Sequence, residues 1–241
     1  MWNCGLVGKK SAQEVLVNGL KRLEYRGYDS AGIATLDDDN EAHLARSVGK
    51  IAELSKVLDK EPQTGHLGIG HTRWATHGGV TETNAHPHHV GRIYLVHNGI
   101  IENYKELKAK LSSYDFASDT DTEVLAALID SNYKDDVSLK DAVAKSLKCV
   151  RGTYGIAVFS PDEPGTIVVA RLGSPLIIGI GKGETIIASD ASALLGYTRE
   201  AIYLNDGELA VCTNEGAEVF SLSLHHLTSK PETIEGDVEQ I

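Results

Sequence analysis

Cysteine and proline are scarce in this 241-residue chain, which has 3 Cys and 6 Pro. An odd number of cysteines without C-x-x-C spacing argues against a disulfide framework and against a zinc site built from thiolates. No apolar run approaches the roughly 18 to 20 residues that a membrane-spanning helix needs, and residues 1–10 lack the basic and apolar regions of a secretory signal. We therefore expect a cytoplasmic protein that has no membrane partner.

Basic residues are also in the minority, because 23 Lys and Arg stand against 34 Asp and Glu, for a formal net charge of -11. Such a surface repels a phosphate backbone on average, so nucleic acid is not an expected partner. The 41% of hydrophobic and 24% of charged residues are typical of an ordinary globular protein with a packed core. The length allows one large domain or two small ones.

Hydrophobic periodicity predicts helices at residues 12–25, 103–111, 119–133 and 139–148. Ser11-Ala-Gln-Glu14 forms a capping box before the first of them. Apolar and β-branched runs between turn residues predict strands at 31–36, 67–73, 93–97, 153–159, 166–171, 176–180, 185–188, 201–204, 208–213 and 217–221. Because the strands come in runs and the helices cluster, an α+β layered sandwich is favoured over regular βαβ alternation.

The end of the chain differs in character from the rest. After residue 226 the sequence is polar and acidic, and it has no periodicity that could bury a face. We therefore predict one domain at residues 1–226 and a linker at residues 227–241 that leads toward a further module.

Short segments concentrate polar, aromatic and glycine residues, usually at strand ends, where sites are commonly built. They are residues 25–32, 71–78, 96–103 and 118–123. The second segment contains a guanidinium that can make a bidentate contact with a carboxylate, and also an indole, a hydroxyl and two imidazoles. This combination favours a small anionic substrate. In the third, the Asn98 side-chain amide beside the Gly99 N–H is a suitable donor pair for an oxyanion. Taken singly, the first and the last are also explained as a helix exit and an acidic first helical turn.

The run His86-Pro-His-His89 lies near further histidines in the sequence and raises the question of a metal site. Imidazole is a common zinc ligand, but no pair in this run has the i, i+4 separation of a helical site and no H-E-x-x-H motif follows. We expect neither a metal nor a cofactor. The alternative, a histidine-rich metal protein, predicts bound zinc on elemental analysis.

Together and in this order, the segments resemble the glutamine amidotransferases of the N-terminal-nucleophile type. The stretches that carry the resemblance are Leu23–Gly32, His71–Gly78, Asn84–His88 and His97–Asn103. They are most similar to the glutaminase domains of glutamine–fructose-6-phosphate aminotransferases, and the similarity extends from about Gly5 to the end of the chain. The resemblance implies a four-layer αββα sandwich of the N-terminal-nucleophile hydrolase type.

The resemblance also assigns the chemistry and the site residues. In that family a cysteine at the mature N-terminus attacks the side-chain amide of glutamine, and its own α-amine, which titrates at about 7.7–8.0, serves as the base. Asn98 and Gly99 would stabilise the tetrahedral oxyanion. Arg73 would bind the α-carboxylate of glutamine and Asp121 its α-ammonium group. The remaining residues carried over are Thr76 and His77 in the pocket, Trp74 at the ammonia exit and Arg26 beside the nucleophile loop.

The resemblance implies partners as well. The substrate of the glutaminase domain would be L-glutamine. Ammonia would pass to a sugar-phosphate isomerase module that converts fructose 6-phosphate to glucosamine 6-phosphate. Such full-length enzymes are expected to be homo-oligomers in the cytoplasm.

The nucleophile position has two interpretations. Matched by content, Cys4-Gly-Leu-Val-Gly8 is the family's start and Cys4 is the nucleophile, which requires removal of residues 1–3. Matched without gaps from the first helix backward, Met1 takes the nucleophile position and Cys4 is a plain strand residue. Three strand residues span about 10 Å, so the two interpretations place the Cys4 thiol at clearly different points.

Several functions follow from these interpretations. The first is a glutaminase in which Cys4 hydrolyses glutamine. The second is a catalytically inactive glutamine-binding or regulatory domain, which the altered start favours. The third is the glutaminase domain of another amidotransferase, such as the one that acts on phosphoribosyl pyrophosphate, which residues 25–30 disfavour.

Overall fold

Two antiparallel sheets lie face to face in the computed structural model, which describes residues 1–234 apart from the side chain of Arg26. The strands of the first sheet, in spatial order, are β15 (Glu232–Thr233), β11 (Glu200–Tyr203), β9 (Ile177–Gly181), β10 (Glu184–Ala188), β1 (Trp2–Val7), β4 (Leu67–Arg73), β2 (Ser30–Leu36) and β3 (Ala42–Val48). The strands of the second sheet are β14 (His226–Leu227), β13 (Gly216–Ser221), β12 (Glu208–Thr213), β8 (Ile167–Leu172), β7 (Gly152–Phe159), β6 (Ile93–Ile101) and β5 (His88–Val90).

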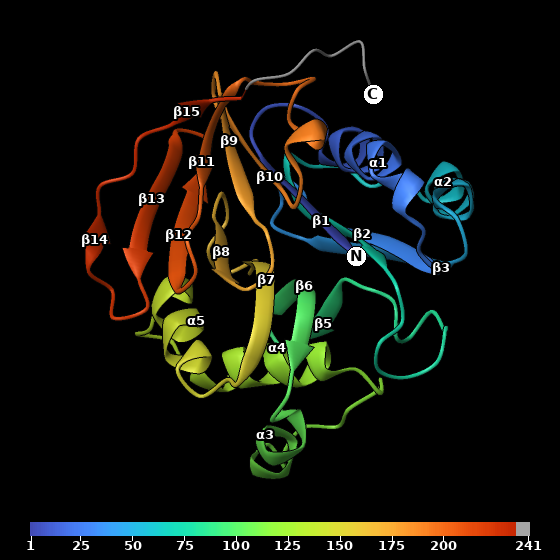
Figure 1. The fold of residues 1–241 in the computed structure, drawn as a ribbon. Coiled ribbons are helices and arrows are strands. Elements are labelled where there is room, and N and C mark those ends of the chain that lie inside the picture. The colour runs from blue at the N-terminus through green and yellow to red at the C-terminus, as the bar shows by residue number, and fades with distance from the viewer. Residues whose placement is uncertain (235–241) are drawn as a thin grey trace.

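Helices cover the outer face of each sheet, as Figure 1 shows. The helices are α1 (Ala12–Arg22), α2 (Ile51–Lys60), α3 (Tyr104–Lys110), α4 (Asp121–Asn132) and α5 (Leu139–Leu147). The first two pack on the first sheet, α4 and α5 pack on the second, and α3 packs on α4. This confirms the predicted α+β class and the four-layer αββα order. No helix within residues 1–234 is long and apolar enough to cross a membrane.

Apolar side chains fill all three spaces between the four layers. Leu16 belongs to the cluster between the first sheet and its helices, Phe159 to the cluster between the sheets, and Leu125 to the cluster beneath α4 and α5. All three are fully buried. Burial of a side chain of this size contributes about 1.5–3 kcal/mol, so each layer contact is held mainly by the hydrophobic effect.

The helix boundaries follow local signals where such signals exist. Ser11 Oγ caps α1 by accepting from the N–H of Glu14, as the capping box predicts. Helix α2, which begins after Lys50 without a side-chain cap, is absent from the predicted elements. Its buried Ile51, Leu54 and Leu58 recur at helical spacing, but the helix is short and no start signal marks it.

The end of the described chain packs onto the first sheet. Thr233 in β15 is paired with Glu200 in β11, and the side chain of Ile234 is buried in the cluster beneath α1. These residues fall within the segment expected to be a linker. Backbone pairing at a sheet edge needs no side-chain periodicity, so the sequence pattern does not reveal it. Residues 235–241 of that segment lie outside the described residues.

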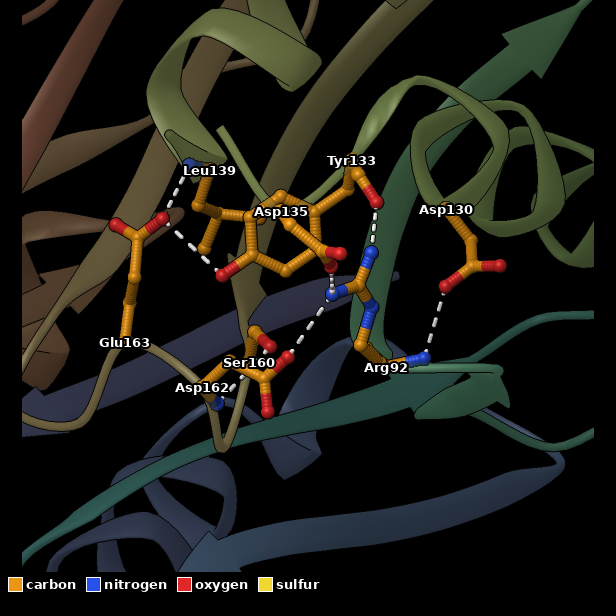
Figure 2. Close-up of polar contacts among 8 residues, drawn as sticks. All are labelled: Arg92, Asp130, Tyr133, Asp135, Leu139, Ser160, Asp162 and Glu163. Atoms are coloured by element: carbon orange, nitrogen blue, oxygen red, sulfur yellow. Dashed lines mark hydrogen bonds and ion pairs between the residues drawn. The ribbon is translucent and has the colours of Figure 1, made fainter. Parts of the chain in front are cut away.

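A polar cluster, drawn in Figure 2, fixes the connection after α4 against the second sheet. Arg92, in the turn between β5 and β6, forms ion pairs with Asp135 and Asp162 and donates to the backbone carbonyl of Tyr133. The Tyr133 hydroxyl donates in turn to Glu163 over 3.1 Å. These bonds anchor the C-terminal end of α4, whose first residue reaches the candidate site.

Candidate functional site

Polar residues from the ends of β4 and β6 and from the start of α4 meet between the two sheets. There they enclose a cavity of about 10 Å³, the inner cavity, lined among others by Met1, Arg73, Thr76, His77, Gly99 and Asp121. Beside it is an open depression of about 450 Å³, the outer cleft, lined among others by Met1, Thr76, Asn98, Gly99 and Ser189. Because Met1, Thr76 and Gly99 line both spaces, the two adjoin as one site.

Arg73 is the last residue of β4, and its side chain is buried. One guanidinium nitrogen donates to the carbonyl of Gly79 over 3.1 Å, and the other terminal nitrogen donates to the carbonyl of His77. Burial lowers the pKa of Arg73, whereas the nearby carboxylates of Asp29 and Asp121 oppose that shift. The cation therefore holds the loop after β4 closed over the site, with carbonyl oxygens in the positions that a bound carboxylate could take.

Asp121 is the first residue of α4, which Thr120 caps by accepting from the N–H of Glu123. One carboxylate oxygen of Asp121 accepts from the N–H of Ile101 over 2.7 Å. The helix N-terminus favours negative charge at this position. With Arg73 on the wall of the same inner cavity, the site offers one cationic and one anionic group, which suits the two charges of an α-amino acid.

Asn98 and Gly99 follow each other in β6 and line the outer cleft. The Asn98 amide nitrogen donates to Ser189 Oγ over 2.9 Å, and its oxygen lies 2.9 Å from Nε2 of His71. Gly99 has φ 133°, and a Cβ there would lie 2.1 Å from the carbonyl oxygen of Thr153. Only glycine fits this position. The structure thus brings the predicted donor pair to the cleft.

The other predicted binding residues lie around the loop after β4. Thr76 lines both spaces, and the ring of His77 meets the edge of Tyr104 with ring centroids 5.2 Å apart. Trp74 is 58% exposed and packs against Gly27, where a Cβ would lie 3.0 Å from its ring. Arg26 ends a 3₁₀ turn at Glu24–Arg26, but its side chain lies outside what the structure describes.

Four histidines are buried at the site: His86 and His97 line the inner cavity, and His71 and His88 adjoin them. Desolvation by burial is the main cause that lowers the pKa of each, and the pKa of His88 falls to about 3. They are therefore neutral near pH 7. His97 Nδ1 and His88 Nε2 each lie 3.0 Å from a threonine hydroxyl at the start of α4. Within residues 1–234, no group of three or more His, Cys, Asp or Glu side chains is arranged to hold a metal ion.

Cys4 is the predicted catalytic residue that the structure does not bring to this site. It is paired with Gly70 and Ala188 in the middle of the first sheet, and its side chain is buried beneath α1 against Gly19. A Cβ on Gly19 would lie 2.8 Å from the Cys4 sulfur. Burial raises the pKa of the Cys4 thiol to about 12. Cys4 is therefore not a residue of the site, as predicted, but a core residue on the face of the first sheet that packs against α1.

The reason is the strand alternation in β1. Successive side chains point to opposite faces of a sheet, so residues three apart lie on opposite faces. Met1 lines the inner cavity and the outer cleft, and the Asn3 side chain reaches Gly155 of the second sheet, whereas Cys4 packs in the cluster beneath α1. The place of Met1 at the site is what the register matched without gaps predicts, in which Met1 takes the position expected of the nucleophile.

Several residues that shape the site are absent from the site residues predicted from sequence. Ser189 contacts the Asn98 amide, and His71 contacts it from the other side. Asp29 accepts from the N–H of Ala75 and so holds the loop after β4. The signal for Ser189 is its place directly after a predicted strand, and His71 and Asp29 lie inside two of the polar segments.

The chain is similar to known proteins over most of its length. Residues 71–196 match the family described as the glutamine amidotransferase domain. The chain is 48% identical, over 90% of its own length, to the glutamine–fructose-6-phosphate aminotransferase (isomerizing) of Photorhabdus laumondii. It is 46% identical over 98% of its length to the corresponding protein of Haemophilus influenzae. It spans only 37% and 39% of these two relatives, which are enzymes by name.

Solved structures show the same architecture. A glutamine phosphoribosylpyrophosphate amidotransferase from B. subtilis, complexed with ADP and GMP, superposes with a TM-score of 0.77 at 28% identity. The match covers 94% of this chain and 50% of that one. A glutamine aminotransferase class-II domain protein from Silicibacter pomeroyi, at 17% identity and a TM-score of 0.62, shares the fold. The chain belongs to the glutamine amidotransferase domain family, and it matches that part of the longer aminotransferases.

Proposed function

We propose that this domain binds L-glutamine in the inner cavity and the outer cleft, and that it is the ammonia-supplying part of a glutamine–fructose-6-phosphate aminotransferase. The observation that carries the proposal is the pair of opposite charges, Arg73 and Asp121, on the wall of one buried cavity. The relatives at 46–51% identity are named glutamine–fructose-6-phosphate aminotransferases, and these names support fructose 6-phosphate as the acceptor of the ammonia. A sugar-phosphate isomerase module, joined after the packed residues 232–234, would use the ammonia in a cytoplasmic homo-oligomer.

Glutamine binding requires the loop after β4 to open, because the inner cavity of about 10 Å³ has room for only about one water molecule. The incoming α-carboxylate takes the place of the His77 and Gly79 carbonyls on Arg73. A carboxylate binds a guanidinium more strongly than a neutral carbonyl does, so the exchange is favourable. The outer cleft of about 450 Å³ is large enough for the glutamine side chain.

Hydrolysis of the side-chain amide develops negative charge on its oxygen. The Gly99 N–H and the Asn98 amide at the outer cleft are the donors that stabilise this charge. The attack itself needs a thiol or hydroxyl nucleophile. In the register described, the residue at the cleft is Met1, whose thioether has no proton to lose.

A second candidate, favoured by the buried Cys4, is a domain that binds glutamine without hydrolysing it. The Cys4 thiol lies on the opposite face of β1 from Asn98, and burial keeps it protonated near pH 7. Such a domain binds glutamine as a regulatory ligand and releases no ammonia. The same binding site serves both candidates, and turnover separates them.

Titration calorimetry with L-glutamine tests binding, and enzymatic detection of ammonia tests turnover. We expect the purified chain to bind L-glutamine and Arg73→Ala to bind it far more weakly. Unchanged affinity in Arg73→Ala would overturn the carboxylate role. Ammonia release that Cys4→Ala abolishes would establish the hydrolase and a rearranged β1, whereas binding without ammonia release would establish the second candidate.

A mass measurement after exposure to a diazo-ketone analogue of glutamine locates the reactive group. An adduct on Cys4 supports hydrolysis by that thiol. A peptide of residues 1–9 that stays unmodified, in a chain that binds glutamine, supports binding without turnover.

A further inference from the structure

The Asn98 side chain is held between two polar partners from distant parts of the chain. On one side its amide oxygen lies 2.9 Å from Nε2 of His71 in β4. On the other side its amide nitrogen donates over 2.9 Å to Ser189 Oγ, which follows β10. Ser189 lines the outer cleft, whereas His71 is completely buried behind Asn98.

An amide can rotate by half a turn, which exchanges its oxygen and its NH₂ group. In the orientation described, the nitrogen of Asn98 lies on the cleft side and the oxygen lies on the His71 side. The exchanged orientation would put a carbonyl oxygen beside the cleft. That oxygen would repel the negative charge that develops on a substrate amide, so the orientation decides whether Asn98 helps or hinders.

We propose that His71 is a positioning residue that fixes the orientation of the Asn98 amide so that its N–H groups face the outer cleft. A carbonyl oxygen only accepts hydrogen bonds, so Nε2 of His71 must carry the ring proton and donate it. This inference rests on the proposed function, because it gives His71 its role through the glutamine site.

The surroundings of His71 keep the ring in this state. Burial holds its pKa well below the usual range, so the imidazole is neutral and has a single N–H. Its other nitrogen, Nδ1, is buried without a hydrogen-bond partner among the described residues, as expected if that nitrogen carries no proton. The ring also stacks on His86 with centroids 4.2 Å apart, which fixes its plane.

Ser189 supports the same orientation from the cleft side. Its hydroxyl oxygen accepts from the Asn98 amide and also from the backbone N–H of Asn3, 3.0 Å away. A hydroxyl oxygen has two acceptor lone pairs, and these two donors use both. The Asn98 amide is thus held by a donor on one side and an acceptor on the other.

The experiment compares His71→Leu, which removes the donor, with His71→Gln, which keeps an N–H group at a similar distance along the side chain. The first readout is the NMR signal pair of the ¹⁵N-labelled Asn98 side-chain amide, identified by its loss in Asn98→Ala. We expect this pair to shift or broaden in His71→Leu and to stay near its original position in His71→Gln. An unchanged pair in His71→Leu would overturn the proposal.

The second readout is glutamine affinity in a double-mutant cycle. We expect His71→Leu to weaken binding about three- to tenfold, His71→Gln to restore it, and His71→Leu to have no further effect in an Asn98→Ala background. Equal weakening in both backgrounds would mean that His71 acts only on packing. If His71→Leu does not fold, Ser189→Ala takes its place. This variant removes the hydrogen bond on the other side of the Asn98 amide. Its effect is measured by the same NMR signal pair and by the same double-mutant cycle of glutamine affinity.

The two readouts separate this inference from the proposed function. The NMR measurement needs no ligand, so it decides the role of His71 even in a chain that binds no glutamine. Absence of glutamine binding by the wild-type chain would count against the proposed function alone.

Discussion

The two faces of β1 have opposite chemistry. On the face toward the second sheet, Met1 lines the site and Asn3 makes buried hydrogen bonds. On the face toward α1, Cys4 and Leu6 are packed in an apolar cluster. The thiol and the binding site are thus close together along one strand, yet the sheet separates them. Whether Cys4 can react with a substrate in the site therefore depends on which face of β1 its side chain points to, and not on how close it is to Met1 in the sequence.

Asn3 fixes this orientation of the β1 side chains. Its side-chain nitrogen donates over 2.7 Å to the carbonyl of Gly155 in the second sheet, and its backbone N–H and carbonyl both bond to Ser189. A shift that moved Cys4 into the place of Met1 would be three residues long and would turn every side chain of β1 to the other face. Leu6 would then leave its cluster, and Asn3 would lose its partners.

The largest effect is expected from Met1→Cys, produced with a free α-amine on residue 1. A thiol on the cleft-facing side of β1 lies beside Asn98 and Gly99, and an α-amine that titrates near 8 can accept its proton. We expect ammonia release from glutamine to rise about a hundredfold or more over the parent, because a correctly placed nucleophile gains that order of rate.

The control for this gain is Cys4→Ala in the Met1→Cys background. It should leave the new activity intact, because Cys4 lies on the other face. A Met1→Cys protein that binds glutamine but releases no ammonia would contradict the assignment of the cleft-facing position.

The next effect is on binding at the polar end of the site. Arg73→Ala should weaken glutamine binding about ten- to a hundredfold, because it removes charge-assisted hydrogen bonds worth about 1.5–3 kcal/mol. Arg73→Lys should recover only part of this, since an ammonium cannot make the two-pronged contact. Calorimetry checks both, and Arg151→Ala, at an exposed ion pair with Glu106, is the matched control with unchanged affinity.

The placement of several residues of the candidate site could be predicted from sequence because these residues lie in local elements. Arg73 ends a predicted strand, Asn98 and Gly99 directly follow a predicted strand, and Asp121 lies at the start of the helix predicted over residues 119–133. The positions of these four residues are set by their own elements, so the local pattern is enough to place them. The α+β class follows for the same reason, since runs of strands and clusters of helices can be read along the chain, whereas the four-layer αββα order comes from the family resemblance.

The remainder depends on contacts between distant segments. The face on which Cys4 lies is set by the pairing of β1 with β4 and β10, which no local pattern specifies. The bond from Asn98 to Ser189 joins residues 91 positions apart. Helix α2 lacks a cap, and β15 is held by backbone pairing at a sheet edge, so neither gives a clear local signal.

A smaller effect is expected from Asn3→Ala, which tests whether the Asn3 hydrogen bonds fix the face to which each β1 side chain points. Loss of the donor leaves the buried Gly155 carbonyl without this bond, which should lower the free energy of unfolding by about 1–3 kcal/mol. Urea unfolding measures it. Glutamine affinity should fall as well, because Ser189 and Met1 lose a fixed neighbour. A stable protein with unchanged affinity would show that the orientation of the β1 side chains does not depend on Asn3.

The smallest effect is expected on the apolar face of β1. There the contribution of the Cys4 thiol to the free energy of unfolding changes only at high pH. Burial raises the pKa of the Cys4 thiol from 9.0 to about 12. As the pH rises past 9, the unfolded chain releases this proton while the native chain keeps it, so the native state binds more protons. The contribution to the free energy of unfolding is therefore complete below pH 9 and is lost between pH 9 and about 12, by up to about 1.4 kcal/mol per pH unit.

Cys4→Ala removes this linkage, so its urea stability should decline less than that of the parent between pH 8 and pH 10. The difference between the two declines should be about 1 kcal/mol. Cys149→Ala, at an exposed thiol, is the matched control and should decline in parallel with the parent. A parallel decline in Cys4→Ala too would mean that the Cys4 thiol already reaches solvent in the native state. A reactive Cys4 on the cleft-facing side of β1 would then become the simpler explanation of any glutaminase activity.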